Sequence, residues 1–280
     1  KKFNLVELGA GNGEMMKVLV STFDKFPKFK NSCSIKILER SKLLQKKQKI
    51  NINKKNIQWL NDLSELDSFP CIFLANEFFD ALPIKQFIKK ERKWFERHVR
   101  FFNNKFEFFD VPFDMEKFEK KIKFKIAKQQ NFIEYSPQST EYLKIINNKI
   151  KHNNGGILII DYAYIDKKMK NTLQAVSKHK YCDVLEGFGN SDITYNLSFN
   201  LLTRIVKELN SLTSMNTTQG EFLTKLGILE RAEILSKKML FSEKADIYFR
   251  IKRLIDKNQM GELFKVMLIT TNKNKFKLGF

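Results

Sequence analysis

The sequence predicts an α/β fold built on a mostly parallel β-sheet with helices on both faces. Short apolar runs alternate with helical patterns through the first third of the chain. A glycine-rich turn joins the first of these runs to the first helical pattern. Alternating strands and helices are typical of right-handed βαβ units, which give parallel sheets covered on both faces. Ligands of such sheets bind at the carboxyl ends of the strands.

Four apolar runs are expected to form the first strands, over residues 5–8, 35–38, 57–60 and 71–75. Helices are expected after Gly13 and after Ser41, between these runs. Residues 85–112 then alternate apolar and charged side chains, which predicts β-hairpins. The Asn103-Asn104 pair is expected to form one of their turns.

One helix is expected to follow the hairpins, with its apolar face formed by Met115, Phe118, Ile122 and Ile126. The hairpins and this helix together predict an insertion over about residues 85–132, after the fourth strand. Because neither a linker nor a repeat divides the chain, a single domain is expected over residues 1–280.

The later elements are expected in a fixed order: a helix over residues 139–151, a strand over 157–160, a helix over 199–209, a sixth short strand, two or three helices and a last strand over 263–270. The Gly155-Gly156 pair is expected to end the first of these helices.

The composition is strongly basic, with 51 Lys and Arg against 31 Asp and Glu and a formal net charge of +20. Such a charge attracts polyanions such as RNA, DNA or anionic lipid. However, Lys, Asn, Ile and Phe all have A/T-rich codons, and much of the Lys lies in predicted helices, as in "KLLQKKQK". Solvated helix faces are therefore the favoured explanation, and nucleic acid is a less favoured partner.

The cysteines point to a reducing compartment. Cys33, Cys71 and Cys182 are odd in number and widely separated, without a C-x-x-C motif or a His/Cys cluster. Neither a metal site nor a disulfide framework is expected. A membrane span is not expected either, because no run approaches the roughly 18 apolar residues that a span requires.

The turn in "VELGAGNGEMM" is the candidate for a cofactor site. Gly9, Gly11 and Gly13 alternate around Ala10, and glycine lets a ligand lie against main-chain N–H groups. Glu7 precedes the turn, where an acid would repel a pyrophosphate but favour a cationic ammonium or sulfonium. This argues for S-adenosylmethionine (SAM) over a dinucleotide, with an ordinary tight turn as the alternative.

Acidic residues also follow the second and third strands. Glu39 closes the second strand, where a carboxylate can accept hydrogen bonds from a ribose diol. Asp62 follows the third strand, and it could bond an adenine amino group while Leu63 packs on the ring. Each acid alone could be a solvated residue at a helix start. Together, at successive strand ends, they favour a SAM pocket.

The fourth strand ends in "LANEFFDALPIKQF", where Asn76, Glu77 and Asp80 are expected at the start of a helix. Glu77 and Asp80 would then lie on nearly one face. Capping of the helix is the structural alternative. The functional interpretation is that these groups hold a cationic substrate group or take its proton. Asp161, after the fifth strand, is expected to line an active-site wall.

These motifs closely resemble the MidA-like family of SAM-dependent methyltransferases. The likeness also includes "IEYSPQS", "GGILIIDYAY", "SDITYNLSF", "TQGEFLTKLGI", "MGELFKVM" and "TLQAVSKHK". His179, in the last of these, either lines the pocket or lies on the surface or in the core. This family includes the mitochondrial protein-arginine methyltransferase that assists the assembly of respiratory complex I. The resemblance implies a Rossmann-like class I methyltransferase fold with SAM as cofactor.

The resemblance also implies a reaction, methyl transfer to arginine of a protein, with a respiratory complex I subunit as a candidate substrate. Asn76, Glu77 and Asp80 would serve catalysis, because carboxylates can localise the charge of a guanidinium and accept its proton. The alternatives are an RNA methyltransferase and a non-catalytic SAM-binding assembly factor. The expected location is the cytoplasm in a bacterium and the mitochondrial matrix in a eukaryote.

Five positions depart from the family pattern. The family commonly has Pro at Ala10, Gly at Ala163 and Asn171, and a His and an Asp at Asn196 and Ser198. These departures bear on the substrate more than on the cofactor. Family members also carry a region before the first strand, which this chain is expected to lack.

Overall fold

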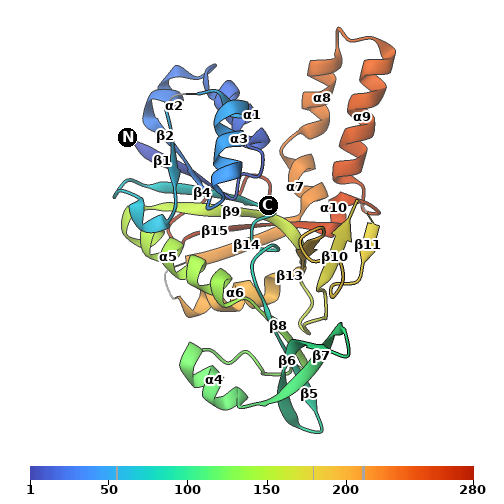
Figure 1. Ribbon diagram of the computed structural model, residues 1–280. Helices are drawn as coiled ribbons and strands as arrows, with labels where there is room; N and C mark the ends of the chain where they lie inside the picture. Colours follow the sequence, from blue (N-terminus) through green and yellow to red (C-terminus); the bar gives the residue numbers. More distant parts are fainter. Residues whose placement is uncertain (55, 179, 210–211) are drawn as a thin grey trace. The chain divides into compact units, whose positions relative to one another are not determined.

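The computed structural model describes residues 1–54, 56–178, 180–209 and 212–280, arranged in two units (Figure 1). The first unit comprises Lys1–Phe78, Lys144–Asp161 and Leu209–Phe280, and the second comprises Phe79–Leu143 and Tyr162–Glu208. Residues 85–132 all lie in the second unit. The single domain with an insertion over these residues stays a prediction.

An eight-stranded sheet contains seven strands in the order β14-β15-β9-β4-β1-β2-β3, and β13 (Leu197–Ser198) joins it off this path by pairing with β9. Those seven strands are β1 (Phe3–Leu8), β2 (Cys33–Leu38), β3 (Ile57–Leu60), β4 (Cys71–Asn76), β9 (Gly155–Tyr164), β14 (Leu212–Thr218) and β15 (Phe264–Thr271). The pairs β1–β2, β2–β3, β1–β4 and β4–β9 are parallel, and β14–β15 is antiparallel. The expected α/β fold with a mostly parallel sheet is confirmed.

Helices lie on both faces of this sheet, with α1 and α3 on one face and α5 on the other (Figure 1). The first part of the unit contains α1 (Glu14–Phe23), α2 (Pro27–Ser32), α3 (Lys42–Ile52) and the 3-10 helix η1 (Leu63–Glu65). The later helices are α5 (Pro137–Asn153), which begins in the second unit, α7 (Gln219–Lys225), α8 (Ile228–Ser236), α9 (Phe241–Ile255) and α10 (Met260–Leu263). Four helices therefore stand between β14 and β15, where two or three were expected.

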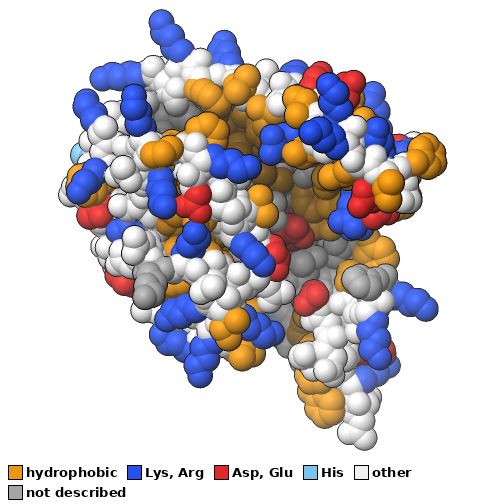
Figure 2. All heavy atoms as spheres, turned by 90° about the horizontal axis from the view of Figure 1, so that it is seen from above, with side chains coloured by type: hydrophobic (Ala, Val, Ile, Leu, Met, Phe, Trp, Pro, Cys, Tyr) orange, Lys and Arg blue, Asp and Glu red, His pale blue; other side chains and the backbone are white. Residues whose placement is uncertain are grey.

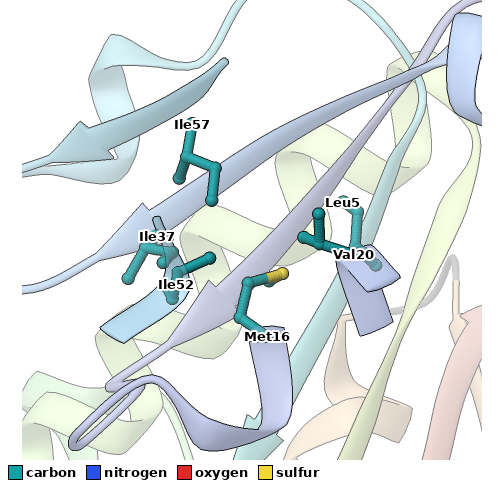
Figure 3. Packing of buried hydrophobic residues seen from close by; sticks show 6 residues of the cluster. All are labelled: Leu5, Met16, Val20, Ile37, Ile52 and Ile57. Atoms are coloured by element: carbon teal, nitrogen blue, oxygen red, sulfur yellow. The ribbon is translucent and has the colours of Figure 1, made fainter. Parts of the chain in front are cut away.

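A close-packed apolar cluster fixes α1 and α3 to the strands β1, β2 and β3 (Figure 3). It consists of Leu5, Met16, Val20, Ile37, Ile52 and Ile57, each at most 7% exposed. Burying a side chain of this size contributes about 1.5–3 kcal/mol. The cluster thereby holds the β1–α1 and β2–α3 connections in place.

The second unit contains two antiparallel sheets. The larger sheet has the order β7-β6-β5-β8, from β5 (Lys85–Lys90), β6 (Lys93–Phe102), β7 (Lys105–Phe113) and β8 (Phe132–Tyr135). The smaller has the order β11-β10-β12, from β10 (Gln174–Ser177), β11 (Lys180–Cys182) and β12 (Asp192–Thr194). The other elements are α4 (Met115–Ile122), α6 (Phe199–Glu208) and β13 (Leu197–Ser198), which pairs with the end of β9.

The expected hairpin turn is confirmed, because Asn103 and Asn104 both have positive φ between β6 and β7. Such a pair suits a two-residue hairpin loop. Two expected helix ends are wrong. Helix α4 stops at Ile122, since Lys123 takes a left-handed φ of 53°, so the buried Ile126 lies outside it.

Helix α5 ends at Asn153 rather than at a glycine pair, because Asn154 supplies the left-handed conformation (φ 66°). Gly155 instead opens β9. A Cβ built there would lie 1.8 Å from the carbonyl oxygen of Cys71, so glycine is required by the close approach of β9 to β4. Among the described residues, no helix is both long and apolar enough to cross a membrane.

Candidate active site

The glycine-rich turn connects β1 to α1 in a left-handed conformation. Gly9, Gly11 and Gly13 have φ values of 64°, 53° and 84°, which side chains with a Cβ rarely adopt. The N–H of Gly13 donates to the carbonyl oxygen of Ala10 (2.7 Å) and closes the turn. A Cβ at Gly9 would meet the Phe78 ring at 2.8 Å, whereas a Cβ at Gly11 would have no neighbour within 4 Å. The turn therefore presents open space at Gly11, where a ligand can approach the main chain.

Glu7 is a buried acid next to this turn. Its side chain is 3% exposed, and its Oε2 has no hydrogen-bond partner. Burial raises its pKa from 4.5 to about 7. A buried carboxylate without a partner is costly unless a ligand compensates it, and a cationic group would do so.

Glu39, at the end of β2, is held by two donors. Its Oε1 accepts from the N–H of Ser41 (2.8 Å), and its Oε2 accepts from Nε2 of Gln48 (3.0 Å). The side chain is 8% exposed. It thus lies in a fixed orientation at the strand end, where the sequence predicts a ribose-binding acid.

Asp62 follows β3 and caps η1. Its Oδ1 accepts from the N–H of Ser64 (2.7 Å), and this hydrogen bond is the main cause of a pKa below the usual range. Glu65 completes a capping box, while Leu63 is 1% exposed. The capping alternative is therefore realised for Asp62, and the adenine contact expected of Asp62 and Leu63 stays a prediction.

The segment after β4 forms a turn and not a helix, which corrects the sequence-based expectation. Glu77 follows the strand with a φ of 49°, and its N–H donates to the carbonyl oxygen of Ile160 (3.0 Å). Residues 77–84 contain no helix, because Glu77 leaves the right-handed region and Pro83 disfavours helix at Leu82. Asn76 Nδ2 donates to Oε1 of Glu77 (3.3 Å). A left-handed glutamate is strained backbone, which is characteristic of functional sites.

Asp161 and Asp80 lie in different units. Asp161, in β9, is fully buried and comes one residue after Ile160, the register partner of Asn76. Asn76, Glu77 and Asp161 therefore lie near the same end of the neighbouring strands β4 and β9 in the first unit. Asp80 belongs to the second unit and is 3% exposed, and its pairing with Glu77 stays a prediction. His179 lies outside the described residues.

Three residues of α3 that no sequence motif indicates form hydrogen bonds to the main chain around the candidate site. Gln45, Gln48 and Asn51 are spaced three apart, and each donates to a main-chain carbonyl, of Glu39, Gly11 and Asn12 respectively. The Lys-rich composition of this helix predicted a solvated face. The spacing of its amide side chains on one helical face is the signal that could have revealed them.

These features define the class of the protein as an α/β protein whose strand ends carry a glycine-rich turn and acids suited to a nucleoside. Residues 1–218 match the model of a family described as "Putative S-adenosyl-L-methionine-dependent methyltransferase". The chain belongs to this family, and the resemblance to MidA-like methyltransferases is confirmed.

Curated relatives carry the name protein arginine methyltransferase NDUFAF7, mitochondrial. The protein of Xenopus tropicalis is 26% identical, with the match covering 95% of this chain and 67% of the relative. The Caenorhabditis elegans homolog is 28% identical, with the match covering 82% of this chain and 58% of the homolog. The human protein is 25% identical, with the match covering 94% of this chain and 65% of the relative. The chain thus spans about two thirds of the length of these relatives or somewhat less.

Two solved structures from Burkholderia thailandensis share the fold. One is a "likely methyl transferase" bound to S-adenosyl-homocysteine, with a TM-score of 0.80, 21% identity, and coverage of 100% of this chain and 74% of that one. The other is a native structure of an uncharacterized protein, with a TM-score of 0.81 and 21% identity. The match covers 99% of this chain and 76% of that one. Both show the class I methyltransferase-like fold.

The residues present fit SAM, the cofactor of this family. Glu7 offers a buried carboxyl group, with an unpartnered Oε2, for a cationic group. The space beside Gly11 admits a ligand to the main chain, and Glu39 offers acceptors for hydroxyl groups. The cofactor roles expected of Glu7, Gly9, Ala10, Gly11, Gly13 and Glu39 stay predictions.

Proposed function

We propose that this chain transfers a methyl group from SAM to an arginine side chain of a protein. The observation that carries the proposal is Glu77, a carboxylate held in left-handed backbone at the end of β4. It is preceded by Asn76 and followed by Phe78, whose ring lies against Gly9 of the glycine turn. Cofactor site and candidate base thus belong to one unit. The names of the relatives support arginine as the acceptor.

A guanidinium is protonated at neutral pH, because its pKa lies above about 12. A carboxylate beside it localises the charge on one side of the group and can accept a proton from the reacting nitrogen. When bound, SAM supplies the methyl group, so that an N–C bond forms as the S–C bond breaks. We assign proton acceptance to Glu77 and a wall of the acceptor site to Asp161. The catalytic role of Asp80, which belongs to the second unit, stays a prediction. Asn76 orients Glu77 through its side-chain amide.

A respiratory complex I subunit is our proposed substrate, on the basis of the family resemblance. The curated relatives are named mitochondrial, so a matrix location is proposed for a eukaryotic source and the cytoplasm for a bacterial one. The RNA alternative lacks a specific observation in its favour. Figure 2 shows Lys and Arg side chains distributed over one face, with acids between them.

Isotope-labelled SAM, incubated with the protein and a cell extract, tests this function. The expected result is label in protein that is recovered as methylarginine after hydrolysis. Label in RNA would support the RNA alternative. Binding of SAM without any labelled product would support a non-catalytic assembly factor. Glu77→Gln is expected to lower the transfer by roughly 10² or more, the usual scale for a general base, while SAM still binds.

A further inference from the structure

Gln48 is a fully buried polar residue in the middle of α3, and no motif of the sequence points to it. Its side chain is 0% exposed, although Lys46, Lys47 and Lys49 surround it in the chain. A buried amide is retained at low cost only when its donors and acceptor are paired. The hydrogen-bond partners of the Gln48 side chain therefore indicate its role in the structure.

The amide of Gln48 joins three elements. Its Nε2 donates to the carbonyl oxygen of Gly11 (2.9 Å) and to Oε2 of Glu39 (3.0 Å). Its Oε1 accepts from Nε1 of Trp59, in β3 (2.8 Å). One side chain thus links the glycine turn, the acid after β2 and the third strand.

These contacts determine how Glu39 can meet a ligand. A carboxylate has about four acceptor positions, of which Ser41 and Gln48 occupy two. The two donors fix the plane of the group and leave the remaining positions for a diol. Because Trp59 holds the amide from the other side, Gln48 cannot turn away without leaving an indole N–H unpaired.

We propose that Gln48 is a positioning residue for the nucleoside part of the cofactor. It orients the Glu39 carboxylate toward the ribose hydroxyls and holds the Gly11 carbonyl in the turn that receives the ligand. The proposal rests on the SAM site of the proposed function and is independent of the methyl acceptor.

The test compares the affinities of S-adenosylhomocysteine and its 2′-deoxy analogue, measured by calorimetry. In the unsubstituted protein the parent compound is expected to bind roughly tenfold or more tightly, as for a hydrogen bond to a charged group. Gln48→Met preserves the size of the side chain and removes all three hydrogen bonds. We expect the preference for the parent compound to fall toward one. Glu39→Gln added to Gln48→Met should then change the preference little further.

Gln219→Met is the matched control. Gln219 lies in α7 of the same unit, is 7% exposed and donates to the main-chain oxygen of Leu254 (3.0 Å), away from Glu39 and the glycine turn. Its substitution should lower stability and leave the preference between the two ligands unchanged. If Gln48→Met does not fold, Trp59→Phe provides a milder variant that removes only the anchor of the amide. We expect it to lower the preference partly.

The outcomes separate this proposal from the cofactor assignment. If the unsubstituted protein binds neither ligand, the SAM site itself is wrong. If it prefers the parent compound and the folded Gln48→Met or Trp59→Phe protein keeps that preference, Gln48 serves only packing and the proposal is overturned.

Discussion

One face of the sheet in the first unit is closely covered by helices over β1, β2 and β3 but is partly open at β4. Over β1, β2 and β3, helices α1 and α3 bury Leu5, Ile37 and Ile57 to at most 7% exposure. On the same face of β4, Ile72 remains 42% exposed. An apolar cavity of about 670 Å³ adjoins it, lined among others by Leu74, Leu158, Phe222, Leu268, Phe276 and Phe280.

Parallel sheets are normally buried on both faces, so the open half is the unusual one. The proposed cofactor site therefore adjoins the well-packed half of this sheet. Gly11 and Glu39 belong to the covered half, whose packing holds them rigidly. Register pairs Glu7 with Leu74, so the buried acid stands at the border between the halves. Rigid placement of binding groups reduces the cost of ligand binding.

The largest expected effect contrasts two isoleucines of this face. Ile37→Ala should lower the free energy of unfolding by about 2–5 kcal/mol, because it opens a cavity in the covered half. Ile72→Ala should cost less than about 1 kcal/mol, because Ile72 is already half exposed. Urea unfolding of both variants measures the contrast. Equal losses would remove the distinction between the halves.

The second effect is a dependence of the free energy of unfolding on pH, which arises from the titration of Glu7. Its pKa is raised from 4.5 to about 7, so the folded protein binds its proton more tightly than the unfolded chain does. Stability from this group is present below pH 4.5 and is lost as the pH rises to about 7, by about 3 kcal/mol. Glu7→Gln should therefore raise the free energy of unfolding of the ligand-free protein at pH 8.5 and have little effect at pH 4.5. Denaturant titrations at both values check this, and an equal effect at both would contradict it.

The smallest effect concerns the strained turn after β4. Glu77→Gly should stabilise the protein by about 0.5–1 kcal/mol, because glycine accepts a φ of 49° more readily. Methyl transfer should nevertheless fall by roughly 10² or more.

Glu91→Gly is the matched control for this turn, since Glu91 has a φ of 45° between β5 and β6. It should give a similar gain in stability and leave transfer unchanged. Thermal unfolding and a single-turnover assay measure both quantities. Unchanged transfer in Glu77→Gly would remove Glu77 from the reaction.

The parallel strands could be predicted because buried strands form continuous apolar runs with clear boundaries. β3 matches its expected bounds, and β1, β2 and β4 extend theirs by one or two residues. The short strands β10 to β12 were missed because they have few buried side chains. Helix ends at Lys123 and Asn154 were missed because left-handed backbone at residues other than glycine leaves little trace in a sequence.

The candidate site likewise contains residues that could be predicted from the sequence and residues that could not. Glycines and acids at strand ends could be predicted, since their chemistry follows from residue type and position. The turn at Glu77 was mistaken for a helix because acids after a strand are also typical helix caps. Gln48 was hidden among lysines, and its burial depends on the glycine turn that it meets 37 residues away.

The most direct test of the central claim is calorimetric binding of S-adenosylhomocysteine to Gly11→Val. A Cβ at Gly11 has no neighbour within 4 Å in the protein, so a side chain there should occupy space left for the ligand. Gly187→Val is the control, because Gly187 also has positive φ (65°) and open space but lies in the second unit. Gly11→Val is expected to abolish binding, whereas Gly187→Val is expected to retain it. Unchanged affinity in a folded Gly11→Val protein would contradict the placement of the cofactor at this turn.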